Sequence, residues 1–419
     1  MRASWRVGEA VATLDLRLDP DDRAVSSGQE GARVRLAGTE SRFEAEIGGT
    51  VHPDLFALLT LALAGPFIAS RLDLDRGVSP EFADEVANAL GFAVRPVDRS
   101  TSPRSSGGTI GISFGGGTDS TAAALALPAN SPLIHLRRLS SRRVPNLHTR
   151  YRADVLEAVV KQFSGFGRQV HIGYSDCEFL VAAPHPTLAS WPGIAAISIL
   201  LADRLDLGGI AVGAVLGSAY MPNGRFREIP AGEAWRRLFD AVGLTLIRPV
   251  AGLTEVSTSR IVAASPYRGM TRSCTFGGPD APCFSCMKCL RKELVVAAAA
   301  GREPDRRLLR NLTADHPVTR ELVAGTAIPG LNVIEYLLNR VDLRGHPLEA
   351  AVERLRHPRE DTEWVGRHFY PAIPENVPKR LRRDVTDAIH SVVEPMTPGD
   401  LELVRSWDST SRFGPSADR

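Results

Sequence analysis

Lysine is scarce in this chain of 419 residues, although basic side chains as a group are not. Arginine supplies most of the 50 basic residues, and lysine is found only at Lys161, Lys288, Lys292 and Lys379. No lysine lies near the glycine-rich turn at residues 115–117, which excludes a Walker-type loop of the form GxxxxGK[ST] there. The dinucleotide fingerprint GxGxxG is excluded too, because Asp119 and Ser120 stand where its last glycine would fall.

A net charge of one sign is also missing, because 50 basic side chains balance 48 acidic ones and leave +2. This balance gives no electrostatic case for nucleic acid or an anionic membrane as a partner. The longest apolar run, Leu55 to Ala69, is broken by Thr60 and Gly65-Pro66 and is too short to span a bilayer. The first residues reach acidic side chains before a signal-peptide core could form. We therefore expect a soluble, cytoplasmic protein.

Cysteine is rare and unevenly placed, and four of the five cysteines form the pattern C-x8-C-x2-C-x2-C. This clustering favours a metal site in a reducing compartment over a disulfide framework. Thiolates at this spacing on a glycine- and proline-rich loop suit a closed, structural zinc site, and an iron–sulfur cluster is the alternative. The expected ligands are Cys274, Cys283, Cys286 and Cys289. We interpret the fifth, Cys177, as a core thiol, with a nucleophile as the alternative.

The stretch SFGGGTDS, residues 113–120, has the composition of a loop that binds an anion. It follows the β-rich run 109–112 and precedes the helix-favouring run 119–127. Glycines let a ligand approach the main chain, and the unpaired N–H groups that open a helix carry partial positive charge. The stretch therefore predicts a phosphate site at the start of a helix, and an ordinary capped turn is the alternative.

The chain divides by pattern into three parts. Residues 1–105 predict a small α+β domain, with strands at 12–18, 33–36 and 43–47 and a helix from Ser79 through Leu90. A linker at 103–108 leads into an α/β domain at 109–300 with a mainly parallel sheet. Its expected strands are 109–114, 132–136, 168–173, 209–215 and 244–248, and its expected helices are 119–127, 150–163, 187–205 and 231–242. Residues 301–419 predict a mostly helical region, with helices at 333–341, 348–355 and 380–393 and a flexible tail.

Two further strand ends carry candidate binding residues, since ligands of such sheets bind beyond the carboxyl ends of the strands. After the second strand a basic loop contains Arg137, Arg138, Arg142, Arg143 and His148. It could meet ATP phosphates or an acidic substrate, although a solvated loop is the favoured interpretation for most of these arginines. After the fourth strand, Tyr220 or Arg225 could contact a planar substrate, and a plain surface loop is the alternative.

The glycine loop and the cysteines together resemble a known family. Residues 116–120 read GGxDS, the four cysteines follow, and Arg291 lies two residues after the last of them. The pair resembles the 7-cyano-7-deazaguanine synthase (QueC-like) branch of the PP-loop ATP pyrophosphatase superfamily, over residues 109–295. The resemblance implies a doubly wound, mainly parallel five-stranded sheet of the HUP (adenine nucleotide α-hydrolase-like) class and a structural Zn²⁺.

The resemblance also implies an ATP-dependent ligase that adenylates a carboxylate, releases pyrophosphate and adds a nitrogen nucleophile to give an amide or nitrile. It implies Asp119, Ser120 and Arg291 as catalytic residues, with Asp119 near Mg²⁺. The ATP-binding residues it implies are Ser113, Phe114, Gly115, Gly116, Gly117, Thr118, Asp119, Ser120 and Gly213.

This chain departs from the family in places that bear on the substrate. Gly115 takes the place of the usual serine, with Ser113 two residues earlier, and Trp191 to Ile194 and Tyr220 to Arg225 differ from the family's substrate elements. We therefore expect the acceptor to be another carboxylate, on a small molecule, peptide or protein.

Two other functions stay open at this stage. One is a PP-loop sulfur transferase, which would need Cys177 as its reactive thiol. The other is a QueC-like non-catalytic nucleotide-binding subunit of a multi-protein system, for example in phage defence, with the terminal regions contacting a partner protein. A homodimer is compatible with each function.

Overall fold

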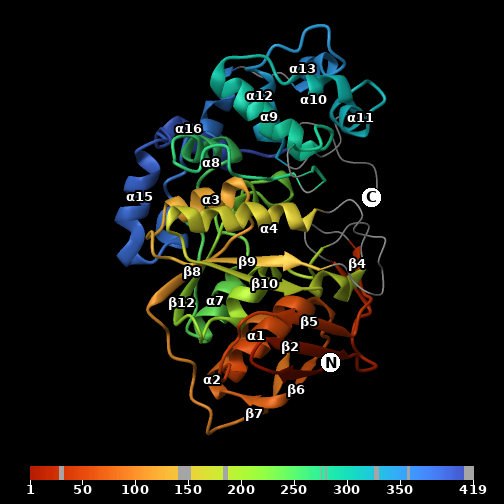
Figure 1. The fold of residues 1–419 in the computed structure, drawn as a ribbon, viewed down its shortest axis with the longest axis vertical. Helices are drawn as coiled ribbons and strands as arrows, with labels where there is room; N and C mark the ends of the chain where they lie inside the picture. The colour runs from red at the N-terminus through yellow and green to blue at the C-terminus, as the bar shows by residue number, and fades with distance from the viewer. Residues whose placement is uncertain are drawn as a thin grey trace.

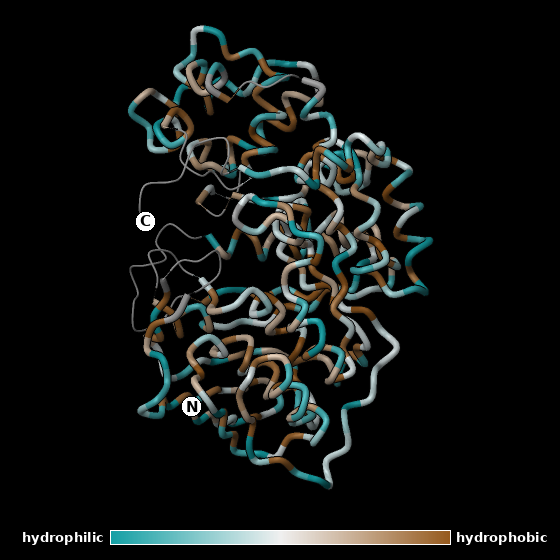
Figure 2. The backbone as a smooth tube through the Cα atoms, turned by 180° about the vertical axis from the view of Figure 1, so that it is seen from behind, coloured by the Kyte–Doolittle hydropathy of each residue, from teal (hydrophilic) through white to brown (hydrophobic). Residues whose placement is uncertain are grey.

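The computed structural model is a mixed α/β fold built on one large, mostly parallel sheet with helices on both faces (Figure 1). The structure describes residues 1–27, 33–139, 152–182, 187–274, 276–278, 281–324, 330–355 and 359–409. Within these ranges, no helix combines the length and the apolar character that crossing a bilayer requires. Figure 2 shows short apolar stretches alternating with polar ones along the chain.

The large sheet has ten strands in the order β13-β12-β8-β9-β10-β5-β2-β1-β6-β7. Neighbouring strands are parallel from β13 to β10 and from β1 to β7, and antiparallel between β10 and β1. The strands are β1 (Arg2–Val7), β2 (Val11–Arg17), β5 (Glu40–Glu44), β6 (Arg71–Val78), β7 (Ala93–Val97), β8 (Thr109–Ser113), β9 (Leu133–Arg138), β10 (Val170–Ser175), β12 (Leu207–Val212) and β13 (Thr245–Ile247). A smaller sheet has the order β11 (Val181–Ala182), β4 (Arg33–Leu36), β3 (Val25–Ser27).

The five strands from β13 to β10 overlap the five predicted from the apolar runs after residue 109. Every residue of β12 is buried, as expected for a strand covered on both faces. From β8 the chain runs outward to β9 and β10, and then returns to the other side of β8 to form β12 and β13. The strand order therefore reverses between β8 and β12, and ligands of such sheets bind at the carboxyl ends of the strands beside this point.

Helices cover the two faces of the sheet and form separate cores. One core contains side chains of α1 (Pro53–Ala64), α2 (Pro80–Leu90), α5 (Ala196–Leu200) and α7 (Glu233–Ala241). The core on the other face contains side chains of α3 (Thr118–Leu125), α4 (Ala153–Gln162), α8 (Glu255–Ala263) and α15 (Arg382–His390). The predicted helix at 187–205 is shorter, since only a 3₁₀ turn, η6 (Trp191–Ala195), and α5 form there.

Helix α2 confirms a prediction made from capping residues. The Ser79 side chain accepts a hydrogen bond from the Phe82 N–H, and Pro80 occupies the first helical position. Gly91 ends the helix with φ of 77°, a left-handed conformation that favours glycine. Local chemistry at its two ends therefore defines this helix.

The predicted linker at 103–108 has no regular secondary structure, but it is anchored to the α/β part. Arg104 is only 8% exposed and donates to Asp203 Oδ1 at 2.6 Å. Its guanidinium also donates to the carbonyl oxygens of Ala202, Leu207 and Val242. Because β5 pairs with β10, the sheet continues across residue 105, and the domain boundary there stays a prediction.

The C-terminal part adds two groups of helices. The first contains α9 (Met287–Ala300), α10 (Arg306–Asn311), α11 (Pro317–Ala324), α12 (Leu331–Leu338) and α13 (Glu349–Leu355), which share a third core. The second contains α14 (Ala372–Asn376), α15 and α16 (Pro398–Arg405); α16 also contributes to the third core, whereas α15 contributes to the core that contains α3 and α8, beside which it lies in Figure 1. Helices α12, α13 and α15 overlap the predicted ones, and the predicted tail from residue 410 lies outside the described residues.

Candidate functional site

The glycine loop lies at the carboxyl end of β8, next to the point where the strand order reverses. Gly116 has φ of 73°, and a Cβ built there would lie 3.1 Å from Cγ2 of Val160 on α4. Only glycine fits this position without strain. Gly117 is the residue before the first turn of α3, so the unpaired N–H groups of that turn begin here, as the sequence predicts.

Three hydroxyl groups beside the loop are bonded to protein carbonyl oxygens, and the hydroxyl of the buried Thr118 lies 3.4 Å from that of Thr271. Ser113 donates to the Ile194 carbonyl at 2.8 Å, which directs it away from the place left by Gly115. Ser120 and Thr121 donate to the Gly117 carbonyl at 3.0 and 2.9 Å. These bonds order the first turn of α3.

Asp119 is held from a neighbouring helix. The buried Thr258 of α8 donates through its hydroxyl to Oδ1 of Asp119 at 2.6 Å. The other carboxylate oxygen, Oδ2, accepts no hydrogen bond from any residue that the structure describes, and Asp119 is half-buried. The residue is thus fixed on one side and open on the other.

Gly213 follows β12 and touches the start of α3. A Cβ at Gly213 would lie 2.7 Å from the Ser120 backbone nitrogen and 2.8 Å from the Asp119 carbonyl carbon. Two backbones approach each other closely here, and only glycine permits this contact. This places the predicted residue Gly213 beside Asp119 and Ser120.

His135 lies beneath the glycine loop on β9. Burial lowers the pKa of this histidine to about 4, although its hydrogen bond to Phe114 acts in the opposite direction. Its Nδ1 lies 2.8 Å from the Phe114 carbonyl oxygen, and because a carbonyl only accepts, Nδ1 donates. A neutral imidazole therefore supports the residue that precedes Gly115.

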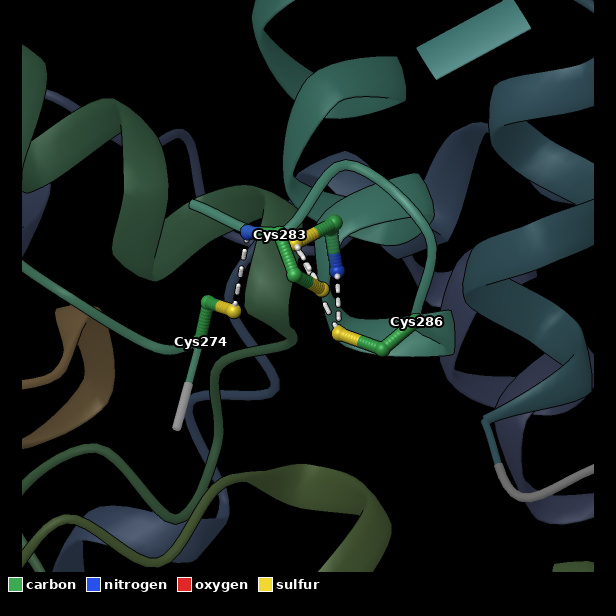
Figure 3. A group of neighbouring side chains, drawn as sticks. Cys274, Cys283 and Cys286 are labelled. Carbon is green, nitrogen blue, oxygen red and sulfur yellow. Dashed lines mark hydrogen bonds between the residues drawn. The ribbon is translucent and has the colours of Figure 1, made fainter. Parts of the chain in front are cut away.

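The four predicted metal ligands come together. Their sulfur atoms all lie within 4.8 Å of one another, and Cys274, Cys283 and Cys286 point toward a common space (Figure 3). Sγ of Cys289 lies 3.6 Å from that of Cys283 and 3.5 Å from that of Cys286. Four sulfurs placed at about 2.3 Å from a tetrahedral zinc ion would lie about 3.8 Å apart. The cluster can therefore hold such a metal ion.

The titration of these thiols fits a site built for a cation. Hydrogen bonds from Cys286 and Cys289 lower the pKa of Cys274. The hydrogen bond to Cys274 raises the pKa of Cys286 to about 11, and hydrogen bonds to Cys274 and Cys286 raise the pKa of Cys289. Hydrogen bonds among the thiols thus set these pKa values, and a bound cation would favour the thiolate forms.

The cysteine cluster and the glycine loop are joined by the backbone. The N–H of Arg272 donates to the Gly116 carbonyl at 3.0 Å. A Cβ at Gly117 would lie 3.6 Å from the Arg272 carbonyl oxygen and 3.7 Å from Oγ of Ser273. Since Cys274 is the next residue, the first metal ligand follows directly on the segment that closes over the glycine loop.

Helix α8 makes a second connection between the two features. Arg291, on α9 after the last cysteine, forms an ion pair of 3.2 Å with Glu255 in the first turn of α8. Thr258 lies one turn further along α8 and contacts Asp119. The three predicted catalytic residues, Asp119, Ser120 and Arg291, thus lie on elements that contact one another.

The basic loop after β9 is only partly described. Arg137 pairs with Glu157 at 3.2 Å, and Arg138 pairs with Glu178 at 3.2 Å. The other candidates of this loop, Arg142, Arg143 and His148, lie outside the described residues.

The remaining residues that the sequence singled out are Tyr220, Arg225 and Cys177. Tyr220 is 1% exposed and donates to Glu375, so its ring is not available to a planar substrate and that suggestion is wrong. Arg225 is accessible, with Asp408 at 3.7 Å. Cys177 is buried, as a core thiol is, and burial raises its pKa to about 12.

Sequence reasoning missed three of the residues that build this site. Thr258, Arg272 and His135 belong to no motif, and each acts through a contact with a distant part of the chain. The only sequence signal for Thr258 is the run of hydroxyl residues at 257–259.

Comparison with known proteins gives one match. The model of a family of unknown function (DUF6395) matches residues 234–408, which include the cysteine cluster and α8 but not the glycine loop. No curated protein and no solved structure matches the chain.

Proposed function

We propose that this protein is an AMP- and pyrophosphate-forming ligase or synthase of the QueC-like kind. It would adenylate a carboxylate and transfer a nitrogen nucleophile to it with release of AMP, giving an amide; a second activation of that amide by ATP would give a nitrile. The observation that supports this most is the joining of the two motifs, in which Arg272 bonds to Gly116 immediately before the first cysteine. This contact holds the segment that leads to the first metal ligand against the glycine loop, as a site built from both motifs requires.

Each residue of the glycine loop would have a role that follows from its position. The N–H groups that follow Gly117 would hold the phosphates of ATP, because they are unpaired and lie at the positive end of α3. Asp119 and Ser120 would lie at the departing β- and γ-phosphates. Mg²⁺, when bound with ATP, would supply charge neutralisation there, and Oδ2 of Asp119 is the oxygen open to it.

The metal at the cysteines would be a structural Zn²⁺. Four thiolates fill a tetrahedral zinc ion and leave no position for a substrate. Their role would be to fix residues 272–274 against the glycine loop and to start α9, where the Cys286 sulfur accepts from the Cys289 N–H at 3.4 Å.

Because the loop contains no lysine, we expect the bond between the α- and β-phosphates of ATP to break. A Walker lysine favours attack at the γ-phosphorus and gives ADP. In this site a substrate carboxylate would attack the α-phosphorus, with the other two phosphates leaving as pyrophosphate. The carboxylate would belong to a substrate other than deazaguanine, which would be a small molecule, a peptide or a protein.

Analysis of the spent nucleotide tests this proposal. ATP–pyrophosphate exchange with a panel of carboxylates, followed by chromatography, should give AMP and pyrophosphate only when an acceptor is present. ADP as the main product would overturn the proposal.

A second function is favoured by one specific observation. Ser113, Ser120 and Thr121 all donate their hydroxyl protons to protein carbonyl oxygens, and Gly115 offers no side chain, so few hydroxyl donors are left to assist the backbone N–H groups at a phosphate. A non-catalytic nucleotide-binding subunit would tolerate this. It would bind ATP without exchange for any carboxylate. Sulfur transfer is the weaker alternative, because the Cys177 thiol is buried with its pKa raised to about 12.

A further inference from the structure

We infer that Thr258 is a positioning residue that fixes Asp119 so that Oδ2 faces the nucleotide-bound Mg²⁺. The inference rests on the proposed function, since it assigns Thr258 a part in the binding of Mg·ATP. Thr258 is fully buried in α8 and contacts a carboxylate that lies on α3, 139 residues earlier in the chain.

The proton of the Thr258 hydroxyl goes to Asp119. A threonine hydroxyl has one proton and two acceptors are in reach, Oδ1 of Asp119 at 2.6 Å and the Glu255 carbonyl at 3.2 Å. The shorter contact has the length of a charge-assisted O–H···O⁻ bond, about 2.5–2.7 Å. Hydroxyls inside helices usually bond back to their own helix, as the neighbouring Ser259 does to the Glu255 carbonyl at 2.7 Å. Thr258 instead makes its shorter hydrogen bond to a residue of another helix.

The hydrogen bond leaves Asp119 one free oxygen. Oδ1 is occupied, whereas Oδ2 has no hydrogen-bond partner among the residues that the structure describes. A carboxylate held by one oxygen cannot rotate its second oxygen away without breaking that bond. Thr258 therefore reduces the number of orientations that Asp119 must lose when a cation binds.

Helix α8 is itself held at its start, so Thr258 is a firm support. Thr254 caps the helix by accepting from the Val256 N–H, and its hydroxyl donates to the Val365 carbonyl at 2.5 Å. Glu255 is paired with Arg291 beside the cysteine cluster. The position of Asp119 thus depends on a helix whose first turn is tied to α9.

The test is the Mg²⁺ dependence of ATP binding, measured without any acceptor. At fixed ATP, thermal unfolding is followed while Mg²⁺ is titrated, and the Mg²⁺ concentration that gives half of the ATP-dependent shift is read. Thr258→Val keeps the shape and removes the hydroxyl, so this concentration should rise about 10-fold or more, the effect of losing a hydrogen bond to a charged group. Thr258→Ser should restore it. Ser259→Ala, which removes a hydroxyl from the same helix turn, should leave it unchanged.

The outcomes separate this inference from the proposed function. If Thr258→Val lowers the melting temperature without ATP but keeps the wild-type Mg²⁺ midpoint, Thr258 is only a packing residue and the inference is wrong. If the wild-type protein shows no ATP-dependent shift at any Mg²⁺ concentration, the proposed function fails and the role of Thr258 fails with it. Should the valine variant not fold, Thr258→Cys, with its weak S–H donor, should raise the midpoint in the same direction.

Discussion

A serine side chain should have different effects on stability at two adjacent glycines, Gly115 and Gly116. At Gly115 a built Cβ meets nothing nearer than Oγ of Ser120, at 4.0 Å, and φ is not in the left-handed region. At Gly116 φ is 73° and the Cβ would lie 3.1 Å from Val160. Gly115→Ser should therefore fold like the wild type, whereas Gly116→Ser should lose about 1–2 kcal/mol to the left-handed backbone alone, and more to crowding.

The serine at 115 should also strengthen ATP binding. A hydroxyl there would face the open side of the loop, where the Ser113 hydroxyl does not reach because it donates to Ile194. A hydrogen bond to a charged phosphate contributes about 1.5–3 kcal/mol, and part of this is lost in ordering the side chain. We expect the ATP dissociation constant to fall about tenfold, which corresponds to about 1.4 kcal/mol.

Calorimetric titration of ATP and urea unfolding measure the two effects. Gly115→Ala is the matched control, since it adds the Cβ without the hydroxyl and should not gain affinity. Equal affinities for the serine and alanine variants would refute the role of the hydroxyl. A Gly116→Ser variant as stable as the wild type would refute the geometry of the loop.

Three further predictions address the rest of the fold. The purified protein should be colourless and contain one zinc per chain by elemental analysis, and Cys286→Ser should lose the metal and several kcal/mol of stability; a brown preparation with labile sulfide would overturn the zinc assignment. Arg104→Met should cost about 3–5 kcal/mol in urea unfolding, because it removes the buried guanidinium that pairs with Oδ1 of Asp203 and donates to three carbonyl oxygens; a loss below 1 kcal/mol would contradict this. Burial lowers the pKa of His135 to about 4 in the folded protein, so between about pH 6.5 and 4 only the unfolded chain takes up a proton at this histidine. The free energy of unfolding should therefore fall as the pH drops through that window, and His135→Gln should make this fall smaller.

The sequence predicted those parts of the site that depend on local patterns. The glycine loop between β8 and α3 followed from three glycines after an apolar run, and the cysteine cluster followed from its spacing. Helix α2 followed from Ser79 and Pro80. In each case the residues that decide the structure lie within a few positions of one another.

The parts that were missed depend on contacts between distant residues. Strands β1, β6 and β7 were not predicted, and no pattern indicated that β5 would pair with β10 to make one sheet. The side chain of Arg104 was interpreted as part of a linker, although it fills a buried site beside Asp203. Tyr220 was taken for a binding residue because it follows a strand, yet it stacks with Phe226 in the interior. Burial of this kind is decided by the partner segments and cannot be read from the residue itself.

The pairing of β5 with β10 has a consequence for the solubility of shortened versions of this protein. The two outer strands of the full sheet are protected, since β13 has only three residues and β7 contains Pro96, which has no N–H to offer a neighbouring chain. A chain that began after residue 105 would lack β5 and would expose the end of β10 (Val170–Ser175), where Tyr174 and Ser175 pair with β5, as an edge with unpaired backbone groups. Such an edge invites pairing between molecules. The first hundred residues therefore protect the α/β part against aggregation through this edge.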